Sequence, residues 1–172
     1  MQGNVVLDGS PGVETQQIAA GLGEGAKRLL RLAVAALARR EHGRVELERK
    51  LQRRLQAGET LGDIAQVLDR LQSRGLLSDQ RMALALVRTR SSRYGRLRIQ
   101  QELQRRGVDR ETIAASLPPA ADESAAAAAL WQRKFGQPAT TPQERARQGR
   151  FLAARGFAAS VIARILSVGE EP

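Results

Sequence analysis

A repeat with a period of about 49 residues constrains the fold of this chain more than any other feature. Its clearest member is the amphipathic stretch 95–117. Adding 49 to a residue number in this stretch finds a partner of the same type, as for Ile113 and Ile162, and subtracting 49 pairs Ile113 with Ile64. Self-similarity at a fixed period is typical of repeat architectures, so the sequence predicts one module that occurs three times.

The first repeat carries a short insertion. Its opening helix matches the second repeat at an offset of 52, which pairs Gly43 with Gly95, whereas the following helix matches at 49. The difference between the two offsets implies three extra residues in the first repeat, which we place near residues 55–60.

Turn and cap residues recur between the helices of these repeats. Gly107 suits the end of a helix, where the backbone often adopts a positive φ. Thr60 and Asp109, which are 49 apart, are each placed to cap the helix that follows. The stretch 141–144 (Thr-Pro-Gln-Glu) has the form of a capping box with proline at the first helical position.

These patterns predict an all-α fold of nine helices in three groups of three. Because one group buries too little apolar surface alone, the groups are expected to stack as an elongated array of tandem three-helix repeats, helix-turn-helix-like units in a rod that can curve. Aromatic residues make up 3% of the chain, so the cores must consist mainly of aliphatic side chains. The predicted segments are a poorly ordered or extra N-terminal segment, three repeats and a tail: 1–24, 25–75, 76–117, 118–168 and 169–172.

The charge balance favours a polyanionic partner. Lys and Arg number 28 against 18 Asp and Glu, for a formal net charge of +10. Such a balance suits nucleic acid, an acidic protein surface or an anionic membrane. A GC-rich genome also raises arginine content, which would need no functional explanation. The planar guanidinium nevertheless binds phosphate and carboxylate through two hydrogen bonds at once.

The sequence shows no pattern typical of an enzyme active site, a metal site or a membrane span. Without cysteine there is no disulfide, thiolate zinc site or cysteine nucleophile. The single histidine, His42, has no acid or nucleophile placed to form a triad, and we expect it to pack beside a helix start. No phosphate-binding glycine loop or metal-ligand cluster is evident. We therefore expect a non-enzymatic chain without cofactor or metal. The lack of a signal peptide and of an apolar run of about 20 residues predicts a cytoplasmic protein without a membrane span.

The candidate site is the outer face of the second helix in each repeat. Ile99 and Leu103, four residues apart, share one face of such a helix. Arg98 and Arg105, seven residues apart, share another face. The predicted contact residues on this face are Arg49, Arg53, Arg98, Arg105, Arg147 and Arg150. Three more arginines recur near the start of the same helices: Arg44, Arg96 and Arg145. The alternative interpretation is a solvated face that keeps the chain soluble.

A helix-turn-helix regulator that reads DNA sequence is the weaker interpretation of three helices per repeat. In such proteins the third helix enters the major groove. The third helices here instead carry acidic residues among few arginines, namely Asp63, Asp69, Asp109 and Glu111. They offer little to phosphates or base edges.

Three stretches, 38–51, 68–79 and 95–108, resemble in order and spacing the signature of the RecX family, bacterial modulators of the RecA recombinase. The first contains an Arg-Arg pair followed by Glu-Leu and Lys-Leu. The resemblance extends from about residue 35 to 166. Two positions depart from the family pattern: Ser78, where the family usually has Asp, and Met82, where it usually has an aromatic residue. Both changes are conservative for capping and packing.

This resemblance implies tandem three-helix repeats that lie along the groove of the RecA–DNA filament. It implies inhibition of RecA's ATP hydrolysis, strand exchange and co-protease activity, without catalysis by the chain itself. The expected partners are the RecA filament and single- and double-stranded DNA, contacted directly or through RecA, with the chain acting as a monomer. Two alternatives remain: a sequence-tolerant DNA-binding protein that acts independently of RecA, and a helical-repeat scaffold for another acidic protein.

Overall fold

The computed structural model describes residues 11–167, and every regular element in this range is a helix. The all-α prediction is therefore confirmed. The ten helices are α1 (Pro11–Ala19), α2 (Glu24–Leu37), α3 (Arg44–Gln52), α4 (Leu61–Ser73), α5 (Asp79–Arg90), α6 (Arg96–Arg105), α7 (Arg110–Ser116), α8 (Ala120–Lys134), α9 (Pro142–Ala153) and α10 (Ala159–Ser167). The predicted tail, 169–172, and residues 1–10 lie outside the described residues.

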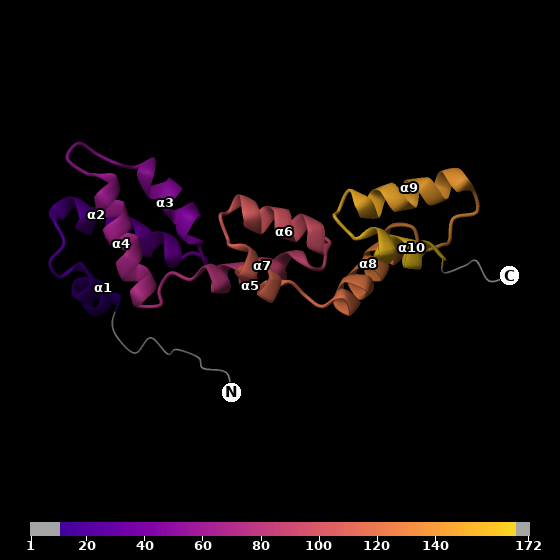
Figure 1. Cartoon of the computed structure of the whole chain (residues 1–172), viewed down its shortest axis with the longest axis horizontal. Coiled ribbons are helices and arrows are strands. Elements are labelled where there is room, and N and C mark those ends of the chain that lie inside the picture. The colour runs from indigo at the N-terminus through magenta and orange to yellow at the C-terminus, as the bar shows by residue number, and fades with distance from the viewer. Residues whose placement is uncertain (1–10, 168–172) are drawn as a thin grey trace, which may run out of the picture. The chain divides into compact units, whose positions relative to one another are not determined.

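Nine of these helices pack in three groups of three, which confirms the predicted three-helix repeat. The groups are α2–α4, α5–α7 and α8–α10, and each surrounds its own apolar core (Figure 1). The chain divides into two compact units, residues 1–78 and 79–172, so the second unit contains both the second and the third group.

Equivalent positions of the repeats are buried in the same way. Leu51, Leu103 and Leu152 are related by offsets of 52 and 49, and each is at most 1% exposed. Burying a leucine side chain fully contributes roughly 1.5–3 kcal/mol, so one such position in each second helix anchors that helix to its group. The third core also holds Trp131, whose indole nitrogen donates to the side-chain oxygen of buried Gln148 at 2.8 Å.

Residues 11–24 precede the first repeat and pack against it. This part of the segment predicted as poorly ordered or extra contains α1, which packs on α2; Ile18 of α1 and Leu22 of the following loop lie in the first core at 2% and 5% exposure. Nη1 of Arg70 in α4 donates to the carbonyl of Ile18 at 2.7 Å and to that of Ala20 at 2.6 Å. These two hydrogen bonds hold the C-terminal end of α1 against α4. An anchor some fifty residues away in sequence cannot be detected from local composition.

The predicted caps are present, with one change of detail. Thr60 and Asp63 form a reciprocal capping box on α4, with bonds of 3.1 and 2.8 Å. Asp109 accepts from the amide of Thr112 at 2.8 Å. Thr141 accepts from the amide of Glu144 at 3.2 Å, but the carboxylate of Glu144 accepts from the amide of the preceding residue, 140, at 2.9 Å. Only half of the predicted box therefore forms at α9.

The predicted insertion lies in the loop between α3 and α4, residues 53–60, and an ion pair holds it. Arg28 of α2 donates from Nε and Nη2 to the two carboxylate oxygens of Glu59 at 2.6 and 2.7 Å. The Glu59 side chain is 5% exposed. The bonds from Arg28, together with one from the amide of Gln56, lower the pKa of Glu59 to about 2.

Candidate functional site

The nine predicted arginines fall into two classes by exposure. The side chains on the outer face of the second helices are exposed: Arg49, Arg53, Arg98, Arg105, Arg147 and Arg150. The arginines near the start of those helices are half-buried: Arg44, Arg96 and Arg145. The first class is therefore accessible to a partner, whereas at least two members of the second bind neighbouring helices.

In the first repeat, Arg44 links α3 to α4. Its Nη2 lies 2.7 Å from the carboxylate of Asp69, and its Nη1 donates to the side-chain oxygen of Gln72. Arg49 and Arg53, which lie one turn apart at the end of α3, remain exposed. Arg44 thus supports the fold, whereas Arg49 in the last turn of α3 and Arg53 at its C-cap have exposed side chains.

The start of α6 receives its hydrogen-bond acceptors from the third repeat. Its N-cap, Gly95, has no side chain to satisfy the free amides that begin every helix. The turn after α9 supplies the acceptors: the amide of Gly95 donates to the carbonyl of Arg155 at 2.9 Å, and that of Leu97 to the carbonyl of Gly156 at 3.2 Å. The third repeat therefore caps a helix of the second.

Glu123 of α8 completes this cap. Its Oε1 accepts from the amide of Arg96 at 3.0 Å, and its negative charge lies at the positive end of the α6 dipole. The guanidinium of Arg96 donates to the carbonyl of Pro118, just before α8. Arg96 thus joins the second and third repeats through both backbone and side chain.

Two glycines permit this close approach. A Cβ atom added to Gly95 would lie 2.3 Å from the carbonyl oxygen of Gly156, and one added to Gly156 would lie 2.5 Å from the Cβ of Arg98. Gly156 also has φ +79°, in the left-handed region, whereas Gly95 has an ordinary φ of −76°. Position 95 therefore requires glycine because the neighbouring backbone leaves no room for a Cβ atom, and not because of its backbone conformation.

Arg98 is exposed but already bound at this junction. Its Nη1 donates to the carbonyl of Ala154 at 3.2 Å, and its guanidinium carbon lies 4.3 Å from the ring centroid of Tyr94. A cation at this distance over an aromatic ring is attracted to the π face. Arg98 therefore stabilises the contact between repeats as well as presenting charge.

The remaining outer-face arginines make weaker contacts. Nε of Arg105 donates to the carbonyl of Gln101 within α6 at 3.3 Å. Arg147 of α9 lies 5.7 Å from the ring centroid of Phe135, and Arg150 is exposed one turn further along. All three side chains are exposed.

A hollow of about 530 Å³ lies beside the junction within the second unit. It is lined by Arg93, Tyr94, Arg98, Leu130, Arg133, Ala154 and Arg155. Sequence reasoning found only Arg98 among these, because the others come from different helices and loops and share no helix face.

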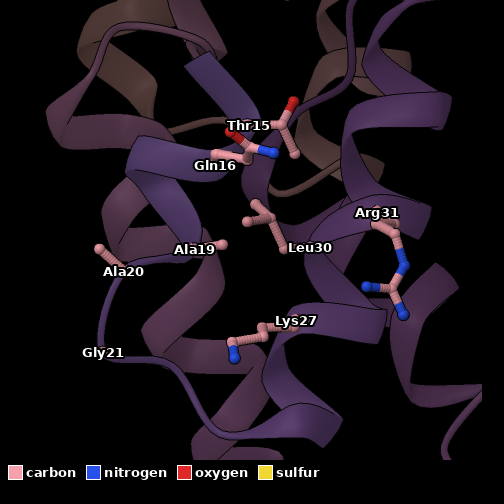
Figure 2. A pocket seen from close by; sticks show the side chains of 8 residues that line it. All are labelled: Thr15, Gln16, Ala19, Ala20, Gly21, Lys27, Leu30 and Arg31. Atoms are coloured by element: carbon pink, nitrogen blue, oxygen red, sulfur yellow. The ribbon is translucent and has the colours of Figure 1, made fainter. Parts of the chain in front are cut away.

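Another hollow, of about 600 Å³, lies between α1 and α2 in the first unit. Figure 2 shows its lining: Thr15, Gln16 and Ala19 from α1, Ala20 and Gly21 from the following turn, and Lys27, Leu30 and Arg31 from α2. Lys27 pairs with Glu24 at 2.7 Å. The described residues that line it include no carboxylate, histidine or cysteine.

His42 is 2% exposed, its Nδ1 lies 2.9 Å from the carbonyl of Arg40, and burial lowers its pKa. It therefore packs directly before α3, in the position predicted. Residues 11–167 contain no group of three histidine or carboxylate side chains that could hold a metal ion. None of the helices described is long and apolar enough to cross a bilayer.

Comparisons with known proteins agree on one family. Residues 78–117 match the family model of the second three-helix domain of RecX, and residues 121–166 match that of the third. Regulatory protein RecX of Pseudomonas entomophila is 49% identical over 140 residues, covering 80% of this chain and 88% of that protein. Regulatory protein RecX of Ralstonia pickettii is 39% identical over 140 residues, covering 81% and 86%.

The fold is shared with solved structures at lower identity. The crystal structure of RecX from Lactobacillus salivarius superposes with a TM-score of 0.73 at 18% sequence identity, covering 86% of this chain and 97% of that one. The two matched domain models coincide with α5–α7 and α8–α10, the groups that the Gly95–Gly156 junction joins. With relatives of close to half identity across four-fifths of its length, the chain belongs to the RecX family.

Proposed function

We propose that this chain is a non-enzymatic modulator of RecA that binds the RecA–DNA filament and suppresses ATP hydrolysis, strand exchange and co-protease activity. The observation that carries the proposal is membership of the RecX family over four-fifths of the chain. The chain then acts in the cytoplasm, as a monomer, and needs no cofactor.

The exposed arginines suit this role. A RecA–DNA filament offers both phosphates and acidic side chains, and a guanidinium binds either through paired charge-assisted hydrogen bonds. The available groups lie on the second helix of each repeat, on α3, α6 and α9. Suppression requires only that the bound chain stabilise an arrangement of RecA subunits that hydrolyses ATP slowly, since a ligand shifts an equilibrium by its differential affinity.

The test is RecA's ATP hydrolysis on single-stranded DNA, with this chain added below the concentration of RecA. We expect the steady-state rate to fall well below that of RecA alone. A parallel strand-exchange assay should show the same loss. An unchanged ATPase rate at equimolar chain, with the chain folded by circular dichroism, would overturn the proposal.

A second candidate is a sequence-tolerant DNA-binding protein that acts without RecA. The net charge of +10 and the exposed arginines favour it. If about 4–6 arginines each neutralise a phosphate, the logarithm of the duplex-binding constant should fall with the logarithm of salt concentration at a slope of roughly −4 to −5. This candidate requires tight DNA binding without RecA together with no effect on RecA's ATPase beyond competition for DNA.

A further inference from the structure

Four arginines converge on the hollow beside the Gly95–Gly156 junction, and the described residues that line it include no acidic side chain. Arg93 comes from the loop before α6, Arg98 from α6, Arg133 from α8 and Arg155 from the turn after α9. Like charges that share a hollow repel one another, so an anion that enters between them is stabilised by all four.

Two of these guanidinium groups form the wall, and two are available to a ligand. Arg98 is held by Ala154 and Tyr94, as described above. Nη1 of Arg155 donates to the carbonyl of Phe151 at 3.0 Å. Arg93 and Arg133 are exposed, and no hydrogen bond or ion pair joins their side chains to the residues described. Their fork-shaped donor sets can therefore bind an incoming oxyanion.

The rest of the lining consists of Tyr94, Leu130 and Ala154. Tyr94 is half-buried beneath the guanidinium of Arg98, and Leu130 is 9% exposed. A guanidinium stacked on an aromatic ring presents a planar surface, on which nucleic-acid bases stack in known complexes. A carboxylate side chain would use the arginines but leave this surface uncovered. Duplex DNA presents phosphates while its bases stay stacked inside, so a single strand matches both parts of the lining.

We propose that this hollow, which we name the 93/133 pocket, binds one segment of single-stranded DNA, with Arg93 and Arg133 on phosphate oxygens and a base against the Arg98–Tyr94 stack. The inference rests on the proposed function, because the strand is taken to be DNA of the filament. It adds to that function a defined contact made by residues outside the second-helix faces.

The neighbouring surface limits the path of the strand. Arg133 also lines a second hollow of about 320 Å³, whose lining includes Asp122 and Glu123. These carboxylates repel a phosphate chain on that side. The strand therefore leaves the 93/133 pocket along the side of Ala154 and the end of α9.

A charge-matched pair of double variants tests the pocket. Arg93→Gln with Arg133→Gln removes its two available cations. Arg88→Gln with Arg110→Gln removes two exposed arginines of α5 and α7 in the same unit, so the net charge changes equally. All four side chains are exposed, and circular dichroism should show unchanged helicity in both variants.

The measurement is fluorescence anisotropy of a labelled oligothymidylate titrated with each full-length protein, without RecA. We expect about a tenfold or greater loss of affinity for the pocket variant, the scale of one or two charge-assisted hydrogen bonds, and about threefold or less for the control. Losing two phosphate contacts should also reduce the slope of the logarithm of the binding constant against the logarithm of salt concentration by roughly 1.4. An oligonucleotide with abasic sites should bind the wild-type protein more weakly than oligothymidylate, because its sugars offer nothing to stack.

Other outcomes separate the failure of the pocket from the failure of the proposed function. Equal losses in both variants would mean that only diffuse charge matters. Polyglutamate serves as a model of an acidic protein segment. If the pocket variant loses polyglutamate binding but still binds oligothymidylate, the pocket binds an acidic protein instead of DNA. If the pocket variant binds oligothymidylate normally but RecA's ATPase remains inhibited, this inference fails while the proposed function stands. Oligothymidylate binding that depends on the pocket, together with no effect of the chain on RecA's ATPase, would instead support the pocket and overturn the proposed function.

Discussion

At the scale of single residues, the pair Gly95 and Gly156 explains a feature that helix signals alone do not. A glycine at a helix start is ordinarily exchangeable for a residue with a capping side chain. At Gly95 the next repeat supplies the capping carbonyls, and the space that a side chain needs is occupied. The glycine at position 95 is therefore explained by the contact between the second and third repeats.

Gly95→Ala should destabilise the second unit. Its Cβ would lie 2.3 Å from the Gly156 carbonyl oxygen, so backbone must move, at a cost of about 1–3 kcal/mol or more. The control is Gly149→Ala in α9, whose Cβ would lie no closer than 3.4 Å to Leu166 and where alanine improves helix propensity by roughly 0.5–1 kcal/mol. Thermal unfolding followed by circular dichroism should show a lower midpoint for the first variant only. Equal midpoints would remove the steric argument.

The ion pair between Arg28 and Glu59 predicts a pH dependence in the first unit. Because the folded-state pKa of Glu59 is lowered to about 2, its contribution is complete above the unfolded-state pKa near 4.5 and is lost as pH falls from there toward 2. Glu59→Gln should therefore unfold at a lower temperature than wild type at pH 7, and the difference should shrink between pH 5 and pH 3. A difference that stays constant across this range would mean that the carboxylate's charge is not what holds the loop.

At the scale of helices, α6 depends on acceptors from another repeat. Glu123 is 5% exposed and holds the amide of Arg96. Glu123→Ala leaves that amide without its acceptor, which should cost about 1–3 kcal/mol, whereas Glu123→Gln keeps an acceptor and should cost less. Asp122→Ala is the control, because the neighbouring carboxylate is exposed in the same first turn of α8. Urea denaturation should rank the variants in that order, and equal effects of Glu123→Ala and Asp122→Ala would contradict the cap.

The helices themselves could be predicted because their signals are local. Thr60, Asp109 and Gly107 mark boundaries through bonds or backbone angles a few residues away. The contacts that join elements could not be predicted in this way. The docking of α1 depends on Arg70, and the cap of α6 depends on carbonyls some sixty residues downstream. Periodicity identified which positions are equivalent in the repeats, but not which of them touch.

The same limit applies to the candidate site. Helical spacing placed Arg98, Arg147 and Arg150 on outer faces, and all three are exposed. Spacing could not reveal that Arg98 is also bound to Ala154 and Tyr94, since those partners belong to other elements. Nor could it assemble the 93/133 pocket, whose residues come from four separate segments of the chain.

At the scale of the whole molecule, the proposed function requires that outer-face arginines contact the filament. Arg98 is a poor residue to test, because reversing its charge would also disturb the junction between repeats. Arg147 and Arg150 are better, since both are exposed on α9 and only Arg147 has a ring nearby, 5.7 Å from its guanidinium carbon. Arg147→Glu with Arg150→Glu should need about tenfold more protein to halve RecA's ATPase rate, equivalent to about 1.4 kcal/mol.

The matched control for this variant is Arg88→Glu with Arg110→Glu, which changes the net charge equally on helices that are not the second of a repeat. Because long-range attraction depends on total charge, both variants should associate more slowly at low salt. Only the α9 variant should remain impaired near physiological ionic strength, where screening removes distant charges and leaves direct contacts. Full inhibition by the α9 variant under those conditions would exclude Arg147 and Arg150 from the interface with RecA or DNA.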